Sequence, residues 1–212
     1  MKSPVAALLL AAGCGLAHAG ILVESPFDID NEGWTALNGI NARSWEPFGG
    51  QRGGYIQARD DGSGTVWLFE ASAAYLGDKT AALGGNLSFW LRTSTLAEPM
   101  DNDWADVRIG GGGLILAFDA RRSPGLDWTF YSIDLKPGRW RLDDVDGPLA
   151  TAADFATVFA NIEHLQIRGE YSARWDIGGL DSVVLSAVPE PHAGWLAALG
   201  LAAVLWRRRP PV

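Results

Sequence analysis

The chain has 212 residues, 48% of them hydrophobic and 20% charged, which is a globular composition and excludes disorder throughout the chain. Its formal net charge of −8 makes it a poor ligand for nucleic acid, which needs a basic face, so nucleic-acid binding is excluded. The single cysteine, Cys14, excludes a cysteine-ligated zinc site and a disulfide framework.

The first part of the chain, residues 1–19, predicts a secretory signal peptide. Lys2 supplies a positive charge, a short apolar core follows, and small residues precede the expected cleavage between Ala19 and Gly20. The apolar core is too short to span a bilayer. A lipoprotein signal, acylated at Cys14, is the alternative. We expect export through the Sec route.

The central segment, residues 20–187, predicts a single all-β domain. It carries 24 acidic and 13 basic residues, a net charge near −11. Apolar residues alternate with polar ones in short runs between Gly, Pro and Asp clusters, which is typical of half-buried antiparallel strands. These runs lie at residues 55–58, 66–69, 87–92, 114–119, 128–133, 165–168 and 181–185.

One helix is expected within this domain, at about residues 151–162. Thr151 and Asp154 stand at the N-cap and N3 positions of a capping box, and apolar residues then recur at helical spacing. A shorter helical turn is expected at residues 73–76. The overall prediction is an antiparallel β-sandwich of the jelly-roll, galactose-binding-like type, with this helix across its end or side.

The last part of the chain, residues 188–212, is a tripartite tail. A Pro-Glu-Pro motif is followed by an apolar segment at residues 195–206, expected to form a helix, and then by three arginines. This order resembles the PEP-CTERM sorting signal of Gram-negative bacteria. The residues that carry the resemblance are Val188, Pro189, Glu190, Pro191, Arg207, Arg208 and Arg209.

The sorting resemblance implies recognition by an exosortase-type membrane protease during export. The apolar helix would insert transiently into the inner membrane, and the protein would then reach the cell surface or extracellular matrix. The arginines after the apolar segment favour a cytoplasmic position for that end. A plain C-terminal membrane anchor is the alternative, although the segment is shorter than the ~20 residues that usually span a bilayer.

Several motifs of the central domain resemble the laminin B domain, also called laminin domain IV. The similarity begins at residues 69–79 with Tyr75-Leu76-Gly77-Asp78-Lys79, continues through residues 83–89 and 165–171, and ends at residues 179–185. The resemblance covers roughly residues 65–187. It implies an extracellular matrix module with a jelly-roll sandwich similar to carbohydrate-binding modules, and it implies no catalytic residues.

Acidic residues at the two ends of the domain form a candidate Ca²⁺ site. Residues 28–33 begin like an EF-hand loop, but Gly39 stands at the twelfth position in place of glutamate, so an EF-hand is excluded. The first and last strands of a jelly roll meet, which would bring Asp28 or Asp30 near Asp181. The alternative is an Asx-rich turn on an acidic surface.

Tryptophans flanked by polar residues are the candidates for a glycan-binding platform, because sugars bind to flat aromatic faces beside hydrogen-bonding groups. We expect most of the domain's eight tryptophans to be buried and two or three to be exposed. The candidate ligand-binding residues are Trp90, Arg92, Trp104, Trp140 and Trp175.

The sequence therefore favours a non-catalytic surface or matrix protein that binds polysaccharide or mediates adhesion. Two alternatives remain. One is an exopolysaccharide-acting glycoside hydrolase using acids such as Asp103 or Asp144, since two suitably spaced carboxylates could serve that reaction. The other is a structural module for protein–protein adhesion, which exposed tryptophans without a groove would favour.

Overall fold

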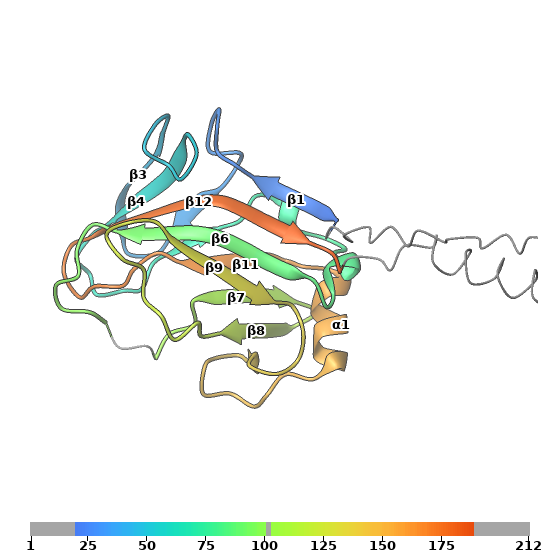
Figure 1. Cartoon of the computed structure of the whole chain (residues 1–212). Helices are drawn as coiled ribbons and strands as arrows, with labels where there is room; N and C mark the ends of the chain where they lie inside the picture. The colour runs from blue at the N-terminus through green and yellow to red at the C-terminus, as the bar shows by residue number, and fades with distance from the viewer. Residues whose placement is uncertain (1–19, 101–102, 189–212) are drawn as a thin grey trace, which may run out of the picture. The chain divides into compact units, whose positions relative to one another are not determined.

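The computed structural model describes residues 20–100 and 103–188, which form two packed antiparallel sheets (Figure 1). Sheet 1 has the strand order β3-β4-β12-β6-β9, and β1 also pairs with β12. Its strands are β1 (Ile21–Ser25), β3 (Ile40–Glu46), β4 (Tyr55–Asp60), β6 (Asn86–Thr93), β9 (Thr129–Asp134) and β12 (Ile177–Ser186). The predicted all-β sandwich is confirmed.

Sheet 2 has the strand order β10-β8-β7-β11-β5-β2 and covers the inner face of sheet 1. Its strands are β2 (Thr35–Leu37), β5 (Leu68–Glu70), β7 (Val107–Gly111), β8 (Leu114–Phe118), β10 (Arg141–Leu142) and β11 (His164–Arg168). Of these, β2, β7 and β10 escaped the sequence prediction, as did β1 and β3 in sheet 1. β2 and β10 are too short to show an alternating pattern, and β3 is almost entirely polar or exposed.

The core lies between the sheets and is built by alternation along each strand. In β6, Leu87, Phe89 and Leu91 are buried, whereas the residues between them are half-buried on the outer face of sheet 1. β12 is the long central strand. It pairs with β6 along one edge, and its other edge is shared by β4 and β1 in succession.

The predicted helix is confirmed as α1 (Ala152–Ala160), which packs against β7 and β8 at one end of the sandwich (Figure 1). Thr151 and Asp154 form the expected capping box, in which the Asp154 carboxylate accepts the Thr151 backbone N–H at 2.8 Å. The apolar stripe is buried, and the helix ends two residues earlier than predicted. Two 3₁₀ turns, η1 (Ala73–Tyr75) and η2 (Thr80–Ala82), precede β6.

The signal peptide, the Pro-Glu-Pro motif, the C-terminal apolar helix and the arginine cluster lie outside the described residues. Within residues 20–100 and 103–188, no helix is long and apolar enough to cross a membrane.

Candidate functional site

The structure divides the predicted ligand-binding residues among different places. Trp90 and Arg92 lie half-buried on the outer face of sheet 1. Trp104 and Trp175 are exposed by 46% and 64% on separate loops, Trp104 just before β7 and Trp175 just before β12. The five residues therefore do not form one platform, and only Trp90 and Arg92 share a strand and a face.

Trp140 is a correction to the prediction, because its side chain is only 1% exposed and cannot stack on a ligand. Its indole N–H donates to the carbonyl of Asp134 at 2.9 Å, and its ring lies 5.0 Å from that of Phe118 and 5.8 Å from that of Phe155. The flanking arginines suggested exposure. Arg139 and Arg141 line a surface pocket, whereas the Trp140 ring between them packs in the core.

On the outer face of sheet 1, an aromatic pair forms across neighbouring strands. Trp90 of β6 lies opposite Phe130 of β9 in the strand register, and their ring centroids are 5.0 Å apart with an interplanar angle of 47°. Phe130 is 48% exposed. Aromatic residues paired across strands stabilise the sheet, and the exposed ring of Phe130 leaves apolar surface facing the solvent.

Arg92 is held next to this pair by two further aromatic rings. Its guanidinium carbon lies 4.5 Å from the ring centroid of Tyr55 and 4.8 Å from that of Trp128. Gly179 of β12 lies opposite Arg92, and a Cβ there would approach both Arg92 and Trp128 to 3.1 Å. A glycine at this position therefore leaves room for the cation–π stack.

A cavity of about 470 Å³ adjoins the Trp90–Phe130 pair, and we call it the outer-face cavity. Aromatic and aliphatic side chains form part of it, and carboxylates, hydroxyls, an amide and a guanidinium supply hydrogen-bonding groups. It is lined by Glu24, Ser25, Pro26, Asp28, Gln51, Arg52, Ser88, Trp90, Phe130, Ser182, Val183 and Val184. Its volume lies within the ~300–1,000 Å³ range of small-molecule sites.

The loop at residues 47–54, between β3 and β4, borders this cavity and is fixed by two hydrogen bonds. The Gln51 backbone N–H donates to the buried Asp181 carboxylate at 2.5 Å, and the Trp128 indole N–H donates to the Gly49 carbonyl at 3.0 Å. Burial raises the pKa of Asp181, and the hydrogen bond from Gln51 partly offsets that effect. A Cβ at Gly50 would lie 2.7 Å from the same carboxylate, so the loop needs glycine there.

Two of the predicted Ca²⁺ ligands accept backbone hydrogen bonds in the structure. Asp181 accepts the Gln51 N–H, and Asp30 accepts the backbone N–H of Glu32 at 2.7 Å in an Asx turn. Among the described residues, no three Asp, Glu, His or Cys side chains are grouped so that they could hold a metal ion. Asp28 borders the outer-face cavity.

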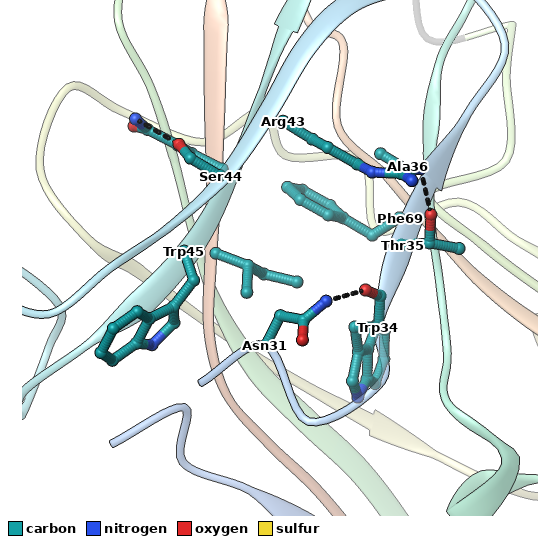
Figure 2. Close-up of a pocket in the computed structure, with 10 residues that line it drawn as sticks. Asn31, Trp34, Thr35, Ala36, Arg43, Ser44, Trp45 and Phe69 are labelled. Carbon is teal, nitrogen blue, oxygen red and sulfur yellow. Dashed lines mark hydrogen bonds between the residues drawn. The ribbon is translucent and has the colours of Figure 1, made fainter. Parts of the chain in front are cut away.

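A second, smaller cavity of about 210 Å³ opens at the edge of the sandwich, and we call it the edge pocket (Figure 2). β2 of sheet 2 and β3 of sheet 1 form its two sides. The buried side chains of Ile56 and Phe69 also line it. Arg43 crosses its mouth and donates to the Thr35 hydroxyl at 2.5 Å. This pocket had no sequence signal, because its walls come from four strands.

Two buried carboxylic acids, Glu170 and Asp176, also escaped the sequence prediction. Burial is the main cause that raises the pKa of Glu170 to about 7 and that of Asp176 to about 6, and the nearby Asp60 carboxylate raises both further. The Glu170 carboxylate accepts the Trp67 backbone N–H at 3.2 Å. Both side chains are almost completely buried, and neither lines the outer-face cavity or the edge pocket. We therefore assign them a structural role.

The carboxylates of the hydrolase alternative are both exposed in loops. Asp103 lies before β7, and Asp144 follows β10 and accepts the backbone N–H of Val145 at 2.8 Å. Neither residue lines the outer-face cavity or the edge pocket. The structure therefore gives no geometric support for a catalytic pair formed by these two residues.

Comparisons with known proteins agree with the fold. The sequence model of the Laminin B (Domain IV) family matches residues 68–198, which is more than half of the chain. Laminin subunit alpha-1 of Mus musculus is 34% identical over 139 residues, which are 61% of this chain and 4% of that subunit. The chain thus spans only a small part of that relative.

Among solved structures, the L4b domain of human laminin alpha-2 shares the fold, with a TM-score of 0.56 and 16% sequence identity. The alignment covers 62% of this chain and 80% of that domain. The family match includes the motifs at residues 69–89 and 165–185, and the antiparallel sandwich agrees with it. The chain therefore belongs to the laminin B (domain IV) family.

Proposed function

We propose that this protein is a non-catalytic, extracellular binding module that holds a neutral polysaccharide in the outer-face cavity. The observation that carries the proposal is the Trp90–Phe130 pair beside a polar-lined cavity of about 470 Å³. Membership of the laminin B family supports an extracellular matrix or cell-surface role.

The chemistry of the cavity suits a sugar ring. The C–H faces of a pyranose pack on aromatic rings, and its hydroxyls need donors and acceptors around the rim. Ser88 and Ser182 provide hydroxyls, Asp28 provides an acceptor and Arg52 provides donors along the same cavity. Because the rings lie on strands of a rigid sheet, the surface is ordered before a ligand arrives.

Charge favours a neutral glycan over an acidic one. Residues 20–187 carry a net charge near −11, and two carboxylates, Glu24 and Asp28, line the cavity against one guanidinium, Arg52. A polyanion such as alginate would meet repulsion from the domain as a whole. We therefore expect neutral β-glucan, mannan or xylan to bind more tightly than alginate.

The test compares aromatic substitutions on the outer face with one elsewhere. Replacing both Trp90 and Phe130 by alanine should weaken binding to the best neutral polysaccharide at least about fivefold, because each of the two aromatic contacts contributes ~0.5–1.5 kcal/mol and ~1.4 kcal/mol is tenfold. Trp175→Ala is the matched control and should leave the affinity unchanged, although Trp175 is the more exposed residue. Affinity electrophoresis against a panel of polysaccharides (β-glucan, mannan, xylan and alginate), with and without Ca²⁺, measures the affinity of both variants.

Two results would contradict the proposal. One is the absence of binding to any polysaccharide of the panel. The other is a loss of affinity with Trp175→Ala that the change at Trp90 and Phe130 does not produce. Polysaccharide binding that requires Ca²⁺ would support the predicted metal site at Asp28 and Asp181.

The export route is part of the proposal and rests on the sequence of the two ends. The signal peptide would be removed between Ala19 and Gly20, and an exosortase-type protease would remove the tail after transient membrane insertion. Mass spectrometry of the protein recovered from the cell surface or matrix should then give an N-terminus at Gly20 and no peptide from residues 195–212. Recovery of those peptides would support the alternative of a permanent C-terminal anchor.

A further inference from the structure

We propose that the edge pocket is a docking site for an extended polypeptide segment, which adds as a strand to the free edge of β3 and inserts one large apolar side chain between the sheets. This partner is distinct from the polysaccharide of the outer-face cavity. Three observations carry the proposal: an unpaired strand edge, a cavity of side-chain size beside it, and an arginine at its mouth that lacks a carboxylate partner.

The first observation is the free edge itself. β3 is the last strand of sheet 1 and pairs only with β4, and its seven residues make no other backbone hydrogen bond within the described part of the chain. The edges of sheet 2 are much shorter, with three residues in β2 and two in β10. A long unpaired edge offers a row of backbone donors and acceptors that another strand can satisfy.

The second observation is the cavity that lies next to this edge. Ala36, Ile56 and Phe69 are buried and provide an apolar interior, and Trp34 and Trp45 wall it (Figure 2). Its volume of about 210 Å³ exceeds the ~150 Å³ of an apolar cavity that binds benzene, and is below the ~300 Å³ at which small-molecule sites begin. A pocket of this size fits one aromatic or branched aliphatic side chain.

Polar groups at the rim are already engaged, which argues against a sugar in this pocket. The Asn31 amide donates to the Trp34 carbonyl at 2.8 Å, and the Thr35 hydroxyl accepts from Arg43. The indole N–H of Trp45 donates to the Phe27 carbonyl at 2.7 Å. An apolar side chain needs no hydrogen bond, whereas sugar hydroxyls placed here would lose theirs.

The third observation is the charge of Arg43. No carboxylate lies within 4 Å of its guanidinium among the residues that the structure places, although the domain is strongly acidic. Arg43 and Trp45 lie on the same, inward face of β3, two residues apart. A docked strand should therefore carry an acidic residue two positions from its apolar anchor, since residues two apart share a face.

The experiment uses a capped seven-residue peptide of threonines with a central phenylalanine and a glutamate two residues before it. Nuclear magnetic resonance titration of the purified protein should give saturable shifts of the backbone amides of β3 and of the Trp45 indole. The same peptide N-methylated at every second residue, so that it cannot pair as a strand, should bind at least tenfold more weakly. Replacing its phenylalanine by alanine should have a similar effect.

Two alanine-to-leucine variants distinguish the effect of filling the pocket from the effect of a larger side chain elsewhere on β3. Ala36→Leu fills the pocket and should weaken peptide binding at least tenfold, whereas Ala42→Leu on the opposite face of β3 should not. If Ala36→Leu does not fold, Arg43→Gln replaces it. That variant should lose affinity for the glutamate peptide and show no further loss when the peptide carries glutamine instead.

The Trp90→Ala, Phe130→Ala double variant should keep its peptide affinity, which separates this proposal from the polysaccharide site. Four results would overturn the inference, and the first three concern the peptide. They are shifts centred away from β3, equal binding by the N-methylated peptide, and the absence of saturable binding by peptides with phenylalanine, leucine or tryptophan anchors. Self-association through β3 in sedimentation would show that a second copy is the occupant, and would also overturn it.

Discussion

Replacing Gly169 by alanine should destabilise the protein by about 3 kcal/mol, at the upper end of the range for overpacking a core. Gly169 follows β11 directly, and a Cβ there would overlap the six-membered ring of Trp67. That indole is completely buried, and its ring lies 4.9 Å from the ring of Phe69. A Cβ at Gly178 would also come within 2.7 Å of the Trp67 ring. The ring therefore has little space into which it can move.

Urea unfolding measures this effect, and Gly125→Ala is the matched control. The nearest atoms to a Cβ at Gly125 are 3.7 Å away, an ordinary contact, so its free energy of unfolding should change by less than about 1 kcal/mol. Equal effects at the two positions would show that the Trp67 environment is looser than the structure indicates. A large effect at Gly169 alone would confirm that the glycine permits the packing of this tryptophan.

The melting temperature should fall by roughly 5–10 °C between pH 5 and pH 8, because two buried acids must ionise. Burial is the main cause that raises the pKa of Glu170 to about 7 and that of Asp176 to about 6, above the ordinary values of 4.5 and 3.8. Between about pH 4 and pH 7 the folded protein thus holds more protons than the unfolded chain. The free energy of unfolding therefore decreases as the pH rises through this window.

Calorimetry at a series of pH values measures this slope, and two conservative variants provide the control. Glu170→Gln and Asp176→Asn remove the titration and keep an oxygen that can accept the hydrogen bonds, including the one from the Trp67 backbone N–H. The double variant should show a flatter dependence between pH 5 and pH 8. A wild-type protein whose melting temperature rises over this range would contradict the assigned direction of both pKa shifts.

The elements predicted correctly from the sequence are those whose physics is local. The alternation of Leu87, Phe89 and Leu91 was sufficient to predict β6 and its buried face, because side chains alternate on any strand. The capping box at Thr151 and Asp154 predicted the start of α1, because both partners lie within one turn. The family motifs similarly lie in contiguous segments, and the family match confirmed them.

The features that escaped prediction depend on which strands become neighbours. Phe130 joins Trp90 only because β9 pairs with β6 in one particular register, and nothing in either segment specifies that pairing. Tyr55 and Trp128 enclose Arg92 for the same reason. Trp140 was misassigned because polar neighbours in sequence do not determine which way a ring points. The raised pKa values of Glu170 and Asp176 depend on burial, which exists only in the folded chain.

The most direct test of the polysaccharide proposal is to map where a neutral oligosaccharide binds. Amide and indole resonances should be followed while a soluble fragment of the best polysaccharide in the panel is added. The proposal predicts that the largest shifts cluster at Ser88, Trp90, Phe130 and Ser182 around the outer-face cavity. Shifts that cluster at Trp104 or Trp175 instead, with the outer face of sheet 1 unchanged, would contradict it.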